Sequence, residues 1–267
     1  MGFTADPQIG DVIDVDHSDG SHAAPVVLLH GWTGSKEDFS RIAEAVAAHR
    51  RVVVPDLPGH GTCPANSDDD YGLAAHVRWV LDLLAALGIE DLHLVGHSHG
   101  GLIAQRVAYL AAHRLRSMTL IGTGVGALGE ESSQHVIRVA TTARDRGMEQ
   151  AWSQLNEATQ DDVAPDARSA FVRRRFLAMT PQAVLGVARN LVTAMPLGAF
   201  LYGIDFPVLV CHGEGDTTWL PHEQRLLARR IPGARYEVIP DALHCPAQEN
   251  PQAMLGLLVP FLAGADH

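Results

Sequence analysis

Short apolar runs alternate with longer amphipathic segments along the first half of the chain. The strand-like runs are 26–29, 52–54, 92–95 and 118–122. The helix-like segments, which carry apolar residues at helical spacing, are 38–49, 73–87 and 100–112. Gly88 follows the second of them as a C-cap. Short buried strands that alternate with helices of this length predict an α/β fold, with a mostly parallel, twisted sheet flanked by crossover helices.

This alternation stops after residue 126 and resumes after residue 202. The interruption contains four helix-like stretches and no convincing strand, at about 130–147, 149–160, 166–179 and 181–195. After it, the predicted strands are 206–211 and 236–239, and the predicted helices are 222–231 and 251–263. All elements of the interruption therefore fall between two strand–helix units.

The interruption divides the chain into a predicted core, residues 1–126 and 203–267, and a predicted helical cap, residues 127–202. A cap inserted at this point would cover the carboxyl ends of the strands, where open α/β sheets bind their ligands. The alternative is a set of extra helices packed against the outside of the domain.

The composition fits a soluble globular protein with a sizeable core, since 46% of the residues are hydrophobic and 19% are charged. With 20 Lys and Arg against 31 Asp and Glu, the formal net charge is −11. This balance disfavours nucleic-acid binding, which depends on basic side chains, and binding to anionic membrane surfaces. No apolar run approaches the roughly 18 residues of a membrane helix. We expect a small-molecule substrate, no nucleic acid and no membrane insertion, with the oligomeric state left open.

The cysteines and the N-terminal residues bear on the compartment. Cys63, Cys211 and Cys245 are odd in number and form no C-x-x-C motif, so a disulfide framework is not expected. The first ten residues lack the basic and apolar regions of a secretory signal. Together these features predict a cytoplasmic location.

The stretch GHSHGG, Gly96 to Gly101, contains the pattern G-x-S-x-G with Ser98 at its centre. An apolar strand precedes it and a helix follows, which is the setting of a nucleophile elbow. Its glycines would let strand and helix approach closely while the serine Oγ projects into the cleft above the sheet. We predict Ser98 as a nucleophile; the alternative is a tight turn without chemistry.

An elbow serine needs a base and an orienting acid. His97 and His99 are poor bases, because a sharp turn splays adjacent side chains in different directions. Two later strand ends offer His244, in PDALHCP, and Asp216, in HGEGDTTW. The competing acids are Glu214, Asp241 and Asp205. Asp216 is favoured because it follows its strand by a turn long enough to reach the cleft.

A developing oxyanion needs preorganised N–H donors. The backbone N–H of His99, directly after the nucleophile, would be one. The loop HGWTGS after the strand at 26–29 would supply the second, with Trp32 favoured and Thr33 as the alternative. The His99 side chain either contacts substrate or hydrogen-bonds locally under the cap. We also predict an apolar substrate pocket lined by Trp32, His99, Trp152 and Trp219.

The motifs HGWTGS, DLPGHG, GHSHGG and GEGD, with the late histidine loop LHC, resemble the α/β-hydrolase superfamily. The resemblance covers about residues 10–125 and 205–263, and 127–202 corresponds to the family's cap only by position. It is greatest for the capped branch of esterases, carbon–carbon bond hydrolases and haloperoxidase-like enzymes. The resemblance implies the α/β-hydrolase fold, the chain order Ser98, Asp216, His244, and no cofactor. Epoxide hydrolases and dehalogenases of the family carry Asp at the elbow, so Ser98 disfavours those reactions.

Several histidines lie in the motif loops, but none has the H-E-x-x-H or H-x-x-E-H spacing of a zinc enzyme, so no metal site is predicted. The preferred function is a serine hydrolase that cleaves a small, largely apolar carboxylic ester or thioester through an acyl-enzyme. One alternative uses the same three residues for carbon–carbon hydrolysis, or for cofactor-free oxygenase or cyclase chemistry, with His244 as the essential base. A second alternative is a ligand-binding protein with slow turnover.

Overall fold

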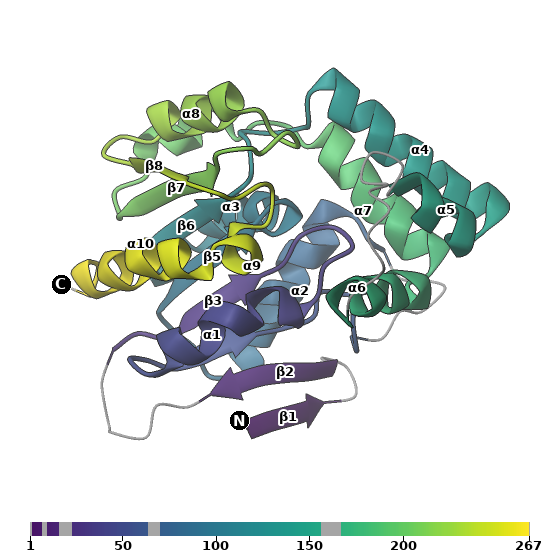
Figure 1. The fold of residues 1–267 in the computed structure, drawn as a ribbon. Coiled ribbons are helices and arrows are strands. Elements are labelled where there is room, and N and C mark those ends of the chain that lie inside the picture. Colours follow the sequence, from purple (N-terminus) through teal and green to yellow (C-terminus); the bar gives the residue numbers. More distant parts are fainter. Residues whose placement is uncertain (1, 7–9, 16–22, 64–69, 156–166, 267) are drawn as a thin grey trace.

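One sheet organises the protein. The computed structural model describes residues 2–6, 10–15, 23–63, 70–155 and 167–266 (Figure 1). Its strands are β1 (Gly2–Asp6), β2 (Gly10–Val15), β3 (Val26–Leu29), β4 (Val52–Val54), β5 (Leu92–His97), β6 (Leu115–Ile121), β7 (Val208–Gly213) and β8 (Arg235–Ile239). They lie in the order β1-β2-β4-β3-β5-β6-β7-β8. From β4 to β8 all neighbours are parallel, which confirms the predicted mostly parallel sheet.

The helices agree with the predicted segments to within a few residues at their ends, except that the short helix at 246–249 was not predicted. They are α1 (Ser40–Ala47), α2 (Leu73–Ala86), α3 (His99–Ala111), α4 (Glu130–Arg146), α5 (Met148–Leu155), α6 (Ala167–Ala178), α7 (Pro181–Thr193), α8 (Pro221–Arg230), α9 (Pro246–Glu249) and α10 (Pro251–Gly264), with short 3₁₀ turns η1 (Lys36–Phe39), η2 (Ala112–Arg114) and η4 (Gly198–Gly203). The helix expected at 149–160 is seen as α5, and its last residues, 156–160, lie outside the described residues.

The antiparallel hairpin of β1 and β2 has no counterpart in the sequence-based prediction. It joins the sheet through antiparallel pairing of β2 with β4. Its strands, GFTAD and GDVIDV, mix apolar residues with Asp and Gly. Asp and Gly are depleted in strands. Pairing with an existing sheet edge, rather than local preference, therefore defines this hairpin.

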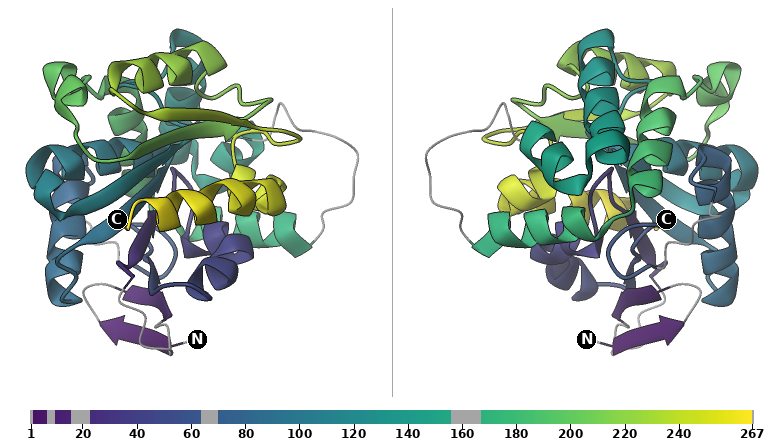
Figure 2. Two further views of the ribbon diagram at one scale, coloured as in Figure 1. Left: turned by 90° about the vertical axis from the view of Figure 1, so that its left-hand side faces the viewer. Right: turned by 90° about the vertical axis from the view of Figure 1, so that its right-hand side faces the viewer.

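Successive residues of each central strand pack into two separate apolar layers. In β3, Val27 and Leu29 face the layer formed with α2, α3 and α8. Val26 and Leu28 face the opposite layer, formed with α1, α9 and α10 (Figures 1 and 2). All four side chains are fully buried. Because helices cover both faces of the sheet, these strands are uniformly apolar instead of alternating.

Helices α4 to α7 lie between β6 and β7 in the chain, and we refer to residues 127–202 as the insertion. The helices gather beyond the carboxyl ends of the parallel strands, at the right of Figure 1. They share an apolar cluster that includes Val139, Phe176 and Val184 and extends to Trp219 of the core. The division into core and cap stays a prediction.

Two glycines allow α3 to pack directly on the backbone of the sheet. A Cβ added to Gly100 would lie 2.3 Å from the carbonyl oxygen of Leu29, and one added to Gly96 would lie 2.4 Å from that of Gly100. Both distances are far inside van der Waals contact. The absence of side chains at these positions therefore fixes how closely α3 approaches β3 and β5, and with it the position of Ser98 between them.

Substitution of Gly100 tests this close approach. We expect Gly100→Ala to lower the free energy of unfolding by about 1–3 kcal/mol, the usual cost of overpacking, measured by urea denaturation. The matched control is Gly256→Ala, in α10, where an added Cβ has no atom within 4 Å. That change should be neutral or raise the free energy by about 0.5–1 kcal/mol, since alanine is the better helix former. Equal effects of the two substitutions would contradict the packing argument.

Candidate active site

Ser98 lies at the tip of the turn between β5 and α3, as the elbow prediction requires. Its backbone has φ 55° and ψ −117°, in a region that costs a non-glycine residue conformational energy. The turn is held by the Ser98 N–H, which donates to the Ile121 carbonyl at 2.9 Å. Strain of this kind persists only where the surroundings enforce it, and it clusters at functional sites. Ser98 is only 4% exposed.

The loops after β7 and β8 bring the other two candidates together. The Glu214 and Gly215 N–H groups each donate at 2.9 Å to carbonyls of the β8 side, those of Ile239 and Ala242. A Cβ added to Gly213 would lie 2.0 Å from the Leu243 carbonyl oxygen, so only glycine permits this contact. The result is a hydrogen bond of 3.0 Å between His244 Nδ1 and Asp216 Oδ1.

Both carboxylate oxygens of Asp216 accept hydrogen bonds. Its Oδ1 also accepts the Thr218 N–H at 2.9 Å, and its Oδ2 accepts the Gln224 amide at 2.9 Å. Burial alone would raise the Asp216 pKa, but the His244 hydrogen bond and charge, with the donors from Thr218 and Gln224, lower it overall. A carboxylate only accepts, so His244 carries its proton on Nδ1 and leaves Nε2 free to act as a base.

The rival acids lie elsewhere. Glu214, Asp241 and Asp205 are exposed, whereas Asp216 is buried. No hydrogen bond or ion pair joins any of these three side chains to His244 in the described residues. Asp216 is therefore the acid that the structure brings to His244.

The His244 ring lies beside the elbow. A Cβ added to Gly122 would lie 3.3 Å from His244 Cε1, and Gly122 directly follows Ile121, the acceptor of the Ser98 N–H. Within the described residues, the Ser98 hydroxyl has no hydrogen-bond partner. Such bonds are often long or misaligned in unliganded sites and tighten when substrate binds.

His97 does not serve as a partner for Ser98. Its Nε2–H donates to the backbone carbonyl of His244 at 2.7 Å, and the two rings are 4.8 Å apart. Burial, followed by repulsion from His244, lowers the His97 pKa to about 4. His97 is therefore a neutral donor that supports the loop carrying His244.

Three backbone N–H groups near the serine are candidates for an oxyanion hole. A Cβ on Gly31 would lie 2.9 Å from Ser98 Cβ, so the HGWTGS loop passes directly over the elbow. The Trp32 and Thr33 N–H groups have no partner among the described residues. The His99 N–H belongs to the first turn of α3, where no intrahelical acceptor exists. These groups could hydrogen-bond an oxyanion.

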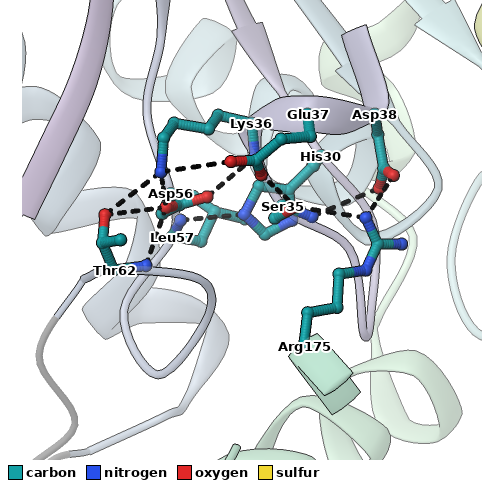
Figure 3. A network of polar contacts seen from close by, with 9 residues as sticks. All are labelled: His30, Ser35, Lys36, Glu37, Asp38, Asp56, Leu57, Thr62 and Arg175. Carbon is teal, nitrogen blue, oxygen red and sulfur yellow. Dashed lines mark hydrogen bonds and ion pairs between the residues drawn. The ribbon is translucent and has the colours of Figure 1, made fainter. Parts of the chain in front are cut away.

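A buried network holds the HGWTGS loop in place (Figure 3). His30 Nε2 accepts the Leu57 N–H at 2.9 Å, so its Nδ1–H donates to the Gly31 carbonyl at 2.8 Å. The Asp56 carboxylate accepts the Lys36 N–H at 2.7 Å and the Lys36 ammonium at 2.5 Å. It also accepts the Thr62 N–H at 2.8 Å. This carboxylate thereby ties DLPGHG to the turn that follows HGWTGS.

Side chains from the insertion reach the same region. In Figure 3 the Arg175 guanidinium of α6 points at Asp38, which it pairs with at 2.5 Å. The Trp32 indole N–H donates to the Val184 carbonyl of α7 at 3.1 Å. The Asn190 amide of α7 donates to the Tyr71 carbonyl at 2.8 Å. The insertion is thus anchored by polar contacts close to Ser98.

The predicted pocket residues fall in different places. Trp219 is buried, packs against Gly124 and has its ring 6.4 Å from that of His244. Trp152 is half-buried in α5 against Phe176. The His99 ring is buried, with its Nε2 3.2 Å from the Asn190 amide. A role for these residues and Trp32 in substrate binding stays a prediction.

Two other kinds of site are absent from the described ranges. No helix there combines the length and apolar character needed to cross a membrane. No group of three or more His, Cys, Asp or Glu side chains in those ranges is arranged to hold a metal ion.

Comparison with known proteins identifies the family. The family model described as the alpha/beta hydrolase fold matches residues 24–251. This chain belongs to the α/β-hydrolase fold family. The match confirms both the predicted fold and the resemblance to this superfamily.

Relatives of this α/β hydrolase include named esterases. A pimeloyl-[acyl-carrier protein] methyl ester esterase of Chromobacterium violaceum is 32% identical over 89% of this chain and 93% of its own. The esterase of the same name from Aeromonas salmonicida is 27% identical over 89% and 94%. A thermophilic esterase of Thermogutta terrifontis superposes with a TM-score of 0.81, covering 99% and 97% of the chains at 24% identity, which shows the fold alone. The chain is an enzyme, and its relatives support an esterase function.

Sequence reasoning missed the residues that support the site. Asp56 lies in DLPGHG, a quoted motif, yet no role follows from the sequence for it or for Lys36. Gln224 lies one helix turn into α8, where nothing in the sequence marks it as a donor to Asp216. Asn190 and His76 carry no motif at all. Their functions depend on contacts between distant parts of the chain.

A cluster of buried histidines lies below the elbow, between the core and α7. The His99 ring meets that of His76 edge-on at 5.1 Å, and His60 lies 5.0 Å from His30. Burial lowers the pKa of His60, His76 and His99, and repulsion from neighbouring imidazoles adds to this for His60 and His99. His60 Nε2 and His99 Nδ1 have no hydrogen-bond partner among the described residues. These rings are therefore neutral in the folded protein.

This cluster predicts a loss of stability in mild acid. Below the unfolded-state pKa of 6.5, the unfolded chain binds protons that the folded chain does not. The free energy of unfolding should therefore fall as the pH drops from 7.5 to 5.5, by up to about 1.4 kcal/mol per pH unit for each such histidine. Urea denaturation across this range measures it. His76→Asn, which keeps a donor towards the Gly72 carbonyl, should reduce the slope; a profile that is flat in the wild type would contradict the assignment.

Proposed function

We propose that this α/β hydrolase cleaves small, largely apolar carboxylic esters or thioesters through a Ser98–His244–Asp216 triad. The observation that carries the proposal is the Asp216–His244 hydrogen bond of 3.0 Å, formed beside the strained Ser98 turn. The three residues come from three separate strand ends and meet at one edge of the sheet. A neutral imidazole with Nε2 free, next to a serine, is the arrangement that general-base activation requires.

The reaction follows from this geometry. Ser98 Oγ attacks the ester carbonyl while its proton passes to His244 Nε2. The N–H groups of Trp32 and His99 hydrogen-bond the oxyanion, and Asp216 stabilises the imidazolium. His244 then gives its proton to the departing alcohol, which leaves an acyl group on Ser98. A water molecule, deprotonated by His244, then attacks that ester. His244 returns this proton to Ser98 Oγ as the acyl–oxygen bond breaks, which releases the carboxylic acid and restores the free serine.

The insertion acts in this proposal as the cap over the site. Ser98 is only 4% exposed, so substrate entry requires the covering side chains to move. Trp32, Trp152, Trp219 and His99 form the predicted apolar surroundings of the acyl chain. The relatives named as methyl ester esterases support an ester with a small alcohol and a chain-like acyl group. Cys63, Cys211 and Cys245 form no disulfide, in keeping with a cytoplasmic enzyme.

A fluorophosphonate probe and a chain-length series of 4-nitrophenyl esters test the nucleophile. The wild type should be labelled and active, whereas Ser98→Ala should escape labelling and lose on the order of 10⁴-fold or more in kcat. The matched control, Ser153→Ala, removes an exposed hydroxyl of α5 and should behave as the wild type. Equal labelling of Ser98→Ala, or undiminished hydrolysis by it, would remove Ser98 from the mechanism.

A second candidate is chemistry with His244 as the essential base and Ser98 as an auxiliary group, such as carbon–carbon bond cleavage. The unpartnered Ser98 hydroxyl is the observation that keeps it open. Comparison of Ser98→Ala with His244→Ala on one substrate separates the two. Comparable loss in both variants supports the acyl-enzyme, and loss confined to His244→Ala supports the second candidate.

A further inference from the structure

A second concave site lies outside the triad, on the surface where α2, α3 and the end of α7 meet. It is a groove of about 710 Å³, within the range of small-molecule sites. Its lining includes Arg78 of α2, Arg106, Tyr109 and Leu110 of α3, Asn190 of α7 and Met195 just after α7. Ser98, Asp216 and His244 do not line it, so the groove is separate from the proposed ester-cleaving centre.

The groove exposes large apolar side chains. Tyr109 is 57% exposed, Leu110 60% and Met195 75%, and they adjoin the apolar residues of α2 in the lining. Single exposed apolar residues are ordinary, but a contiguous apolar concavity marks a surface that binds something. An alkyl chain laid along α2 and α3 would remove this surface from water.

The charged side chains of the groove lining are cationic. Arg78 and Arg106 are the only charged side chains among its described lining residues. Arg106 is held in place by two backbone carbonyls, those of Leu102 at 3.0 Å and Met195 at 2.7 Å. These bonds use two of its five N–H donors, and partial burial lowers its pKa.

Neither arginine has a carboxylate partner in the described part of the chain. Asp82, one turn along α2 from Arg78, makes no ion pair with it. Arg50, Arg51, Arg116 and Arg175 pair with Asp, whereas the two arginines of the groove, like the exposed Arg189, have no such partner in the described residues. Among the described residues, the groove lining therefore combines two cations that have no carboxylate partner with large apolar side chains.

We propose that this groove binds a free long-chain carboxylate, a fatty acid, with its head group at Arg78 and Arg106 and its alkyl chain along the apolar lining. An arginine fork matches a carboxylate in geometry and charge. The groove is concave and accommodates a single chain, and the net charge of −11 opposes docking on an anionic membrane. The occupant would also touch Asn190, whose amide contacts the His99 ring.

Calorimetric titration of the full-length protein with dodecanoate, below its micelle concentration, tests this site. Arg106→Gln removes the anchored cation, and Ala74→Glu places a carboxylate at an exposed position of the lining. Each should weaken binding at least about tenfold, the effect of losing or opposing one charge-assisted hydrogen bond. The matched control, Arg189→Gln, removes the same charge from an exposed position of α7 outside the lining and should change the affinity less than about twofold.

Three results would overturn the proposal. The first is the absence of dodecanoate binding to the wild type. The second is equal binding by all variants, which would place the acid elsewhere, for example in the cleft beside Ser98. The third is equal affinity for dodecan-1-ol, which would show that no cationic group takes part. Thermal unfolding checks that Arg106→Gln is folded, and if it is not, Ala74→Glu decides, because that residue lies on an exposed helix surface.

Discussion

Close approach of backbone to backbone, at the edge where the parallel strands end, is the constraint on which the rest of this structure depends. Gly100 meets the Leu29 carbonyl, Gly213 meets that of Leu243, and Gly31 passes over Ser98. None of these contacts leaves space for a Cβ. Because four loops are brought together without intervening side chains, the proposed catalytic groups that they carry lie close together. The polar network around Asp56 and the Asp216–His244 pair then fix the loops in orientation.

The pattern of apolar residues predicted most of the fold. The strands from β3 to β8 and the long helices were recognisable because helices cover both faces of the sheet, so the buried strands are mostly apolar. The hairpin of β1 and β2 was not recognisable, since its sequence has no such run and its strands are defined by pairing with β4. The local pattern of apolar residues predicts strands and helices that are buried in the core. It misses strands that form only by pairing with the edge of a sheet.

The candidate site likewise contains residues that the sequence predicted and residues that it did not. Ser98, Asp216 and His244 each follow a predicted strand, and parallel strands end at a common edge, so their proximity follows from topology. The residues that hold these three side chains in place cannot be predicted from topology. Gln224 reaches Asp216 from the next helix, Glu249 caps the N–H groups of Leu243 and Cys245 at the base of the histidine loop, and Asn190 reaches His99 from α7. Each is an ordinary polar residue whose role exists only after the chain has folded.

The glycine contacts at the elbow and the insertion differ in how well they tolerate substitution, and this difference affects how such an enzyme can evolve. At the elbow almost any new side chain collides with backbone, so variation there is eliminated by misfolding before it can alter chemistry. Besides the apolar cluster that it shares with the core, the insertion is held near Ser98 by side-chain contacts such as Arg175 to Asp38 and Trp32 to Val184. Its helices can therefore diverge while those anchors persist. If the proposed function holds, selection for new substrates should change α4 to α7 more than the loops that carry Ser98, Asp216 and His244.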